Sequence, residues 1–112
     1  MVKSLGILTL TAGTPVRLTA NLPAPTQREG AQRIQIFPVP ANAGVVYVGM
    51  EGMVIATGVQ LLGAIPKPAS ATTGPFEPFT LEEYTSPNGF DAAQIFVDGT
   101  TNDQVIAYLT NG

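Results

Sequence analysis

Residues 34–53 read IQIFPVPANAGVVYVGMEGM and carry the most regular pattern in the chain. Ile34 and Ile36 alternate with polar side chains, which is typical of a strand with one buried face. The two prolines of the FPVP run then remove amide donors and end the hydrogen-bonded ladder. The stretch therefore predicts a strand over residues 33–39 that stops at a proline-marked turn.

The second half of this stretch predicts a return strand and a further turn. Asn42 and Gly44 both tolerate a positive φ, so we expect the chain to reverse direction there. Residues 45–50 and 53–57 are rich in apolar and β-branched side chains, and they flank the pair Glu51-Gly52. Such a pair predicts a tight two-residue hairpin turn. The stretch contains no histidine and no cysteine, so we interpret it as a rigid scaffold.

Similar short runs lie on both sides of it. The first two runs are expected to turn one set of apolar residues inward, namely Leu8, Leu10 and Ala12 and, after a Gly-Thr-Pro turn, Val16, Leu18 and Ala20. Residues 94–97 and 104–109 form the last two runs, on either side of the hairpin loop DGTTND at 98–103. With 12 glycines and 10 prolines, the chain leaves little room for helices. The predicted fold class is all-β: an antiparallel β-sandwich, jelly-roll-like or Ig-like, with long Pro-rich loops.

Length and composition limit the classes of function. The 112 residues predict one domain, 1–112, and 12% charged against 45% hydrophobic residues predict a surface partly covered by other protein. The net charge is −3 and the five basic residues are scattered, which argues against nucleic acid as a partner. Glycine, proline or a polar residue interrupts every apolar run, so no membrane span is expected. The alternating start favours a first strand over a signal peptide.

Two segments lack strand patterning, and we expect them to be extended arms: residues 21–30 and residues 63–78. Large apolar groups on such a loop must dock on the domain or on a partner, and docking of Phe76 and Phe79 on the parent domain is favoured. Residues 81–84 predict one helical turn or a short edge strand. The candidate protein-contact residues on the two arms are Pro23, Pro25, Arg28, Pro66, Lys67, Pro68, Phe76 and Phe79.

The side chains offer little for catalysis. Without histidine or cysteine, the most common general base and the best nucleophile are missing, so we predict no enzyme, no catalytic residue and no cofactor. The loop at 98–103 is oxygen-rich but lacks the ligand register and closing Glu of an EF-hand, so no metal site is predicted. Adventitious calcium between Asp98 and Asp103 stays open as an alternative. Phe37, Phe96 and Tyr108 lie in predicted strands and are expected in the core.

Four motifs in this order resemble a known group of proteins: LTAGTPVRLT, RIQIFPVPANAGVVYVG, the acidic TLEEYTSPNG and AAQIFVDGTTNDQVIAYL. They are similar to the small β-sandwich virion proteins of tailed bacteriophages, the capsid decoration or cement proteins and related minor head proteins. The resemblance implies a structural protein of the virion, assembled in the host cytoplasm, without substrate or cofactor. It implies binding to the major capsid protein on the outer face of the shell and self-association, with a trimer favoured over a dimer.

Two other readings stay open. Composition equally allows a carbohydrate- or surface-binding β-sandwich module of a phage tail or spike, with Phe76, Phe79 or Tyr84 as the aromatic platform. A small hydrolase that uses carboxylates is the least favoured, because the eight Asp and Glu residues lie mostly in turns, where local backbone contacts are the usual role.

Overall fold

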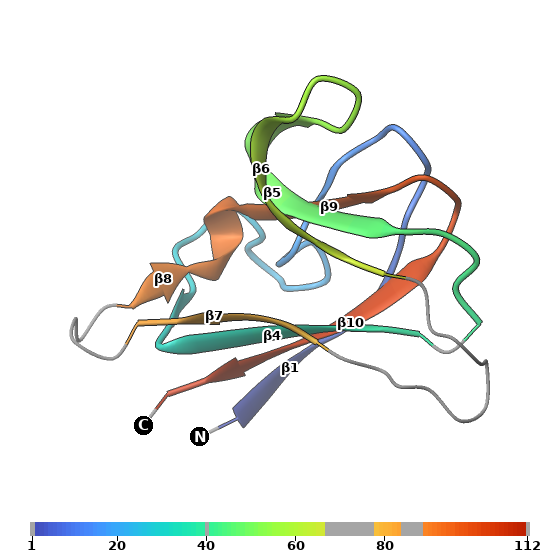
Figure 1. The fold of residues 1–112 in the computed structure, drawn as a ribbon. Helices are drawn as coiled ribbons and strands as arrows, with labels where there is room; N and C mark the ends of the chain where they lie inside the picture. The colour runs from blue at the N-terminus through green and yellow to red at the C-terminus, as the bar shows by residue number, and fades with distance from the viewer. Residues whose placement is uncertain (1, 40, 67–77, 84–88, 112) are drawn as a thin grey trace.

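The computed structural model describes residues 2–39, 41–66, 78–83 and 89–111, and Figure 1 shows their fold. These residues form ten strands and one 3-10 helix, which confirms the predicted all-β class. The elements are β1 (Val2–Thr9), β2 (Val16–Arg17), β3 (Gly30–Ala31), β4 (Arg33–Pro38), β5 (Val46–Val54), β6 (Val59–Ile65), β7 (Phe79–Glu82), β8 (Phe90–Asp91), η1 (Ala92–Gln94), β9 (Ile95–Gly99) and β10 (Gln104–Thr110).

The strands form two antiparallel four-stranded sheets, in the orders β1-β10-β4-β7 and β2-β9-β5-β6, and β3 pairs separately with β8. If the β3–β8 pair is set aside, the first of the eight remaining strands pairs with the last. The second pairs with the seventh, the third with the sixth and the fourth with the fifth. Successive pairs alternate between the two sheets. This nested pairing is the topology of a jelly roll, so it decides between the two arrangements that alternation left open.

The core lies between the two sheets. The alternation predicted for β4 is present, because Ile34 and Ile36 are fully buried and their neighbours are half-buried. On the facing sheet, Val46 and Val48 of β5 are buried. In the first sheet, every second residue of β10 is buried beside β4. Burial of such side chains contributes roughly 1.5–3 kcal/mol each before the cost of ordering the chain.

Three aromatic residues do not lie in this core, although the sequence predicts them there. Phe37 and Tyr108 are only half-buried, on the strand positions between the core residues, and their rings pack edge to face 5.9 Å apart. Phe96 is also half-buried and lies under the Arg17 guanidinium. The prediction was wrong because aromatic side chains in a strand can also lie on the outer face of the sheet, where neighbouring side chains partly cover them.

A bulge at Gly6 sets the face that β1 turns to the core. Gly6 has a φ of +78°, and the pairing with β10 shifts register there, so Leu5 and Leu8 are both buried although they are three residues apart. The strand ends at Thr9. The predicted inward position of Ala12 is therefore wrong, and Ala12 is exposed in a turn.

The second predicted run is also shorter in the structure. Only Val16 and Arg17 form a strand, and this strand belongs to the other sheet, so the turn before it carries the chain across the sandwich. Leu18 is buried as predicted, but Ala20 is exposed and Thr19 is buried. The Thr19 hydroxyl donates a 2.6 Å hydrogen bond to the Pro25 carbonyl, which satisfies it inside the domain.

The hairpin turn predicted at Glu51-Gly52 is wrong. Strand β5 continues through both residues to Val54, and the chain reverses at residues 55–58 before β6. Gly52 does have a positive φ, +85°, but it lies at an irregularity in the β5–β6 register. A bulge and a hairpin turn both use glycine with positive φ, so the dipeptide alone did not separate them.

Two further boundaries differ from the prediction. Residues 63–65 belong to β6, so the second unpatterned segment begins later than expected. Residues 98–103 do not close a hairpin, because β9 and β10 lie in different sheets. Near residue 81, where the sequence allowed either one helical turn or a short edge strand, the structure has the strand β7 at the edge of the first sheet.

Candidate functional site

The first predicted contact segment, residues 21–30, lies against β1. Asn21 Nδ2 donates to the Ile7 carbonyl at 2.9 Å, and Lys3 Nζ lies 2.8 Å from Glu29 Oε1. Short turns within the segment are closed by backbone hydrogen bonds, so it is not the extended arm that the sequence predicts. Among the candidate contact residues here, Pro23 and Arg28 are exposed and Pro25 is half-buried.

The second predicted contact segment is described only in part. Pro66 is exposed, whereas Lys67, Pro68 and Phe76 lie outside the described residues, as does Tyr84. Phe79 lies in β7 and packs, half-buried, against the core of its own domain. A β-carbon placed on Gly63 would lie 2.3 Å from Cε2 of the Phe79 ring, so the ring sits directly on the β6 backbone. Phe79 is therefore not an exposed aromatic platform.

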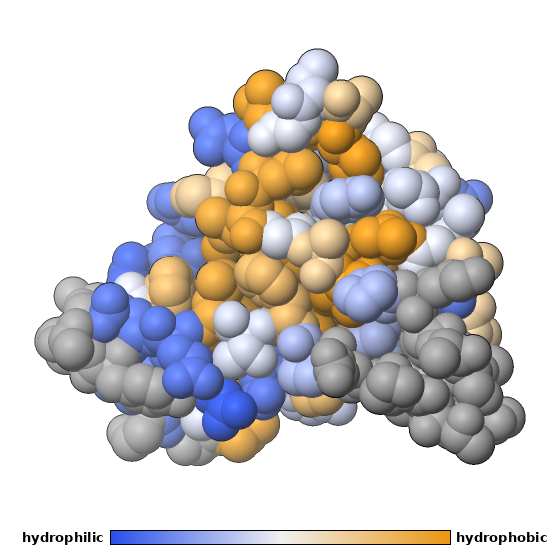
Figure 2. All heavy atoms as spheres, viewed as in Figure 1, coloured by the Kyte–Doolittle hydropathy of each residue, from blue (hydrophilic) through white to orange (hydrophobic). Residues whose placement is uncertain are grey.

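An apolar surface lies along the side of the sandwich where β6 and β7 are the outermost strands of their sheets. Val54, Val59 and Leu62 are 45%, 49% and 44% exposed, and β6 contains no charged residue. Figure 2 shows apolar residues gathered along this side, from the tip of the β5–β6 hairpin down toward β7. We call strand β6 with its exposed Val59 and Leu62, together with Val54 at the end of β5, the β6 edge.

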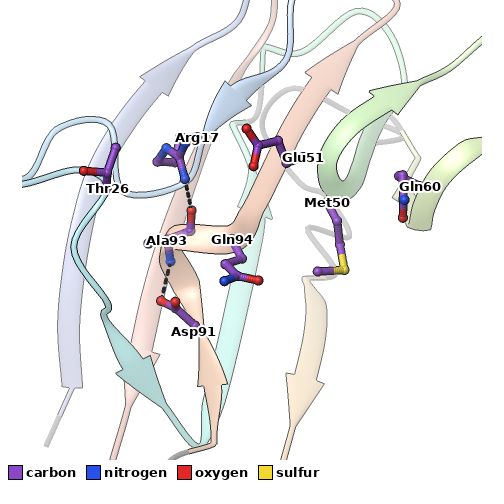
Figure 3. Close-up of a pocket in the computed structure, with 8 residues that line it drawn as sticks. All are labelled: Arg17, Thr26, Met50, Glu51, Gln60, Asp91, Ala93 and Gln94. Atoms are coloured by element: carbon purple, nitrogen blue, oxygen red, sulfur yellow. Dashed lines mark hydrogen bonds between the residues drawn. The ribbon is translucent and has the colours of Figure 1, made fainter.

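A polar cleft of about 260 Å³ is lined by residues of β2, β5 and β6 of the second sheet and by residues of β8 and η1 (Figure 3). The lining residues are Arg17, Thr26, Met50, Glu51, Gln60, Asp91, Ala93 and Gln94. The Arg17 guanidinium donates to the Ala93 carbonyl and lies 4.7 Å from the centroid of the Phe96 ring. Both contacts hold it in one orientation, with further N–H groups available to a ligand.

The Asp91 carboxylate of the cleft is also fixed. Asp91 Oδ1 accepts 3.0 Å hydrogen bonds from the backbone N–H groups of Glu29 and Ala93. Gln60 has a φ of +57°, the one positive value at a non-glycine residue in the described part of the chain. Such a conformation costs energy and is frequent at binding sites. Together these groups can donate to and accept from a polar ligand.

The loop that the sequence presented as oxygen-rich has a structural role. Asn42 exchanges two hydrogen bonds with the Gln104 backbone, at 2.8 and 3.0 Å. Asp103 accepts from the N–H groups of Ala43 and Gly44, both at 2.9 Å, and from the Thr101 hydroxyl at 2.5 Å. These contacts tie the loop after β9 to the loop before β5. Neither Asn42 nor Gly44 has the positive φ that the sequence predicts for them.

Burial and hydrogen bonding act on the Asp103 carboxyl in opposite directions. Burial alone raises its pKa, but the hydrogen bonds from Thr101, Ala43 and Gly44 favour the charged form, and the net pKa lies below the usual value of 3.8. Its oxygens thus face N–H and O–H donors. Across the residues that the structure describes, no group of three or more acidic side chains is close enough to hold a metal ion.

The cleft could not be predicted from the sequence, because its lining comes from five segments that the fold brings together. Nothing in the sequence linked Arg17 to η1 or to β6. No family model matches the chain, and no curated protein or solved structure is significantly similar to it. In the described part of the chain no helix is long and apolar enough to cross a membrane.

Proposed function

We propose that this chain is a non-enzymatic structural protein of a tailed-phage virion, which binds the outside of the capsid and holds neighbouring capsomers together. The observation that supports this proposal is the β6 edge. An outermost strand presents unpaired backbone N–H and C=O groups, and natural proteins usually protect such strands with charges, prolines or bulges along the exposed edge. Strand β6 has neither a charge nor a proline, and Val59 and Leu62 are exposed on it. Of the three devices only an irregular register is present, in the pairing of β6 with β5.

An edge of this kind suits a permanent protein partner. A strand from another chain can add to it through backbone hydrogen bonds, while the apolar side chains supply buried area. The jelly roll is used by viral capsid proteins and by lectins, so the fold by itself does not assign the role. The resemblance in motif order favours the virion, with the major capsid protein and further copies of this chain as partners and a trimer favoured over a dimer.

Co-sedimentation with phage heads tests this proposal. Purified protein is mixed with expanded heads of the phage that encodes it, and the bound amount is measured as the protein concentration rises. We expect saturable binding at a fixed ratio to the capsomers, and a homo-oligomer in sedimentation velocity. A monomer that leaves the heads entirely in the free fraction would contradict the proposal.

The polar cleft favours a second candidate, a carbohydrate- or surface-binding module of a tail or spike. A fixed guanidinium, two amide side chains and two carboxylates match a ligand rich in hydroxyl groups. Specific binding on a glycan array that is lost on Gln94→Ala would favour this candidate, because Gln94 is exposed and lines the cleft. Retention of that binding in Thr14→Ala, at an exposed turn residue outside the cleft, serves as the control.

A further inference from the structure

A second hollow lies between the β5–β6 hairpin and the loops that contain residues 12–13 and 98–100. It is an open groove of about 530 Å³ between the hairpin and two loops of the sandwich, and we call it the hairpin groove. Its walls come from residues 53–56, and its floor from residues 12–13 and 98–100. Figure 1 shows the hairpin rising away from the rest of the second sheet. Four apolar side chains line the wall: Met53, Val54, Ile55 and Ala56.

One buried carboxylate lies in this apolar setting. Asp98 is only 3% exposed, and its Oδ1 accepts hydrogen bonds from Gly13 N at 3.0 Å and from Gly99 N at 2.8 Å. Its Oδ2 accepts no hydrogen bond from any residue that the structure describes. This oxygen is not fully buried, so it reaches solvent in the groove, where a cationic donor can form a charge-assisted hydrogen bond with it.

The groove therefore matches one kind of side chain. Its wall suits the methylene stem of a long basic residue, and the Asp98 carboxylate suits the charged end of that residue. No other charged side chain lines the groove, so nothing there repels a cation. We propose that the hairpin groove binds a lysine or arginine side chain of a partner protein. This inference does not depend on whether that partner is a capsid protein.

Amide chemical shifts of ¹⁵N-labelled protein can test the inference with small probes. N-acetyl-lysine methylamide carries the proposed side chain, and N-acetyl-norleucine methylamide carries nearly the same stem without the charge. We expect the lysine probe to shift the Gly13 and Gly99 amide signals saturably, because both amides bond to Asp98. The norleucine probe should bind at least tenfold more weakly, since it leaves the carboxylate without a donor. Equal binding of the two probes, or no shift with either, would overturn the proposal.

Two variants and a control locate the site. Asp98→Asn keeps an oxygen for the two backbone amides but removes the charge, so lysine affinity should fall about tenfold while norleucine binding stays the same. Ala12→Trp places a large side chain in the groove from an exposed position and leaves Asp98 itself unchanged. This variant should abolish lysine binding. Ala20→Trp, also at an exposed position, should bind as the wild type does. Unchanged lysine binding in Ala12→Trp would refute the location even if Asp98→Asn failed to fold.

A third probe separates a protein side chain from a free cation. The n-butylammonium ion carries the same charged end and stem but no peptide backbone, so it is compared with the lysine probe in the same titration. We expect the lysine probe to bind at least as tightly, because the backbone beside the groove adds contacts. Tighter binding of n-butylammonium would mark a site for free alkyl cations and would overturn the assignment to a partner protein.

Discussion

Replacement of Asp103 by asparagine should destabilise the fold markedly, because Asp103 accepts three hydrogen bonds, two of which join it to another loop. Asparagine has one carboxamide oxygen, which can keep the bonds from Gly44 N and the Thr101 hydroxyl. Its NH₂ group then faces Ala43 N–H, which loses its acceptor. An unsatisfied N–H of this kind costs about 1–3 kcal/mol, and the two bonds that remain weaken when the acceptor is neutral.

These contributions add up to a loss of about 2–3 kcal/mol in the free energy of unfolding. For a domain of this size, about 4 °C per kcal/mol is a reasonable conversion, so the melting temperature of Asp103→Asn should fall by roughly 8–12 °C. Urea denaturation monitored by circular dichroism measures the first quantity, and thermal denaturation the second. The control is Glu51→Gln, which removes the same charge from an exposed side chain and should leave stability nearly unchanged.

The pH dependence of this difference tests the electrostatic part of the reasoning. The pKa of Asp103 is lower in the folded protein than in the unfolded chain, so the carboxylate stabilises the fold fully above the unfolded pKa, about 4. That stabilisation is lost as the pH falls through the folded pKa. The gap between wild type and Asp103→Asn should therefore be largest at neutral pH and should shrink in acid. A gap that stays constant in acid, or that matches Glu51→Gln at neutral pH, would refute the reasoning.

Two glycines give further predictions. Gly63→Ala should lower the free energy of unfolding by about 1–3 kcal/mol, because the new methyl group meets the Phe79 ring, and Phe79→Leu should recover part of this loss in the double variant. Strictly additive losses in urea denaturation would contradict that contact. Gly44→Ala should cost a similar amount, because its β-carbon would lie 2.5 Å from Thr100 Oγ1 and 2.7 Å from Thr101 Oγ1. A melting temperature equal to that of the wild type would show that the two loops separate without cost.

Local alternation predicted the strands well where one face of a strand is buried and the other is not. Ile34 and Ile36 define β4 in this way, and the last strand follows the same rule. Such patterns could not predict which strands pair with one another. Ig-like sandwiches and jelly rolls use the same alternation, and only the contacts between distant strands separate them.

The predictions that the structure contradicts failed for physical reasons. Gly52 can serve a turn or a bulge with the same positive φ, and the length of the loop after β9 does not say which sheet the next strand joins. The polar cleft and the hairpin groove were not visible at all, because each gathers residues from segments far apart in the chain. Asp98 shows this clearly. In the sequence it belongs to a loop rich in oxygen, whereas in the fold it is a buried carboxylate beside an apolar wall.

The most direct test of the proposed function is the binding of one variant pair to phage heads. Leu62→Glu puts a charge on the β6 edge at an exposed position, and Thr14→Glu puts the same charge on an exposed turn elsewhere. Both variants should fold as the wild type does. In co-sedimentation with expanded heads, Leu62→Glu should lose at least tenfold in affinity, since burial of an unpaired carboxylate against the partner costs more than 1.4 kcal/mol, and Thr14→Glu should bind normally. Equal binding of the two variants would contradict the assignment of the β6 edge as the contact surface.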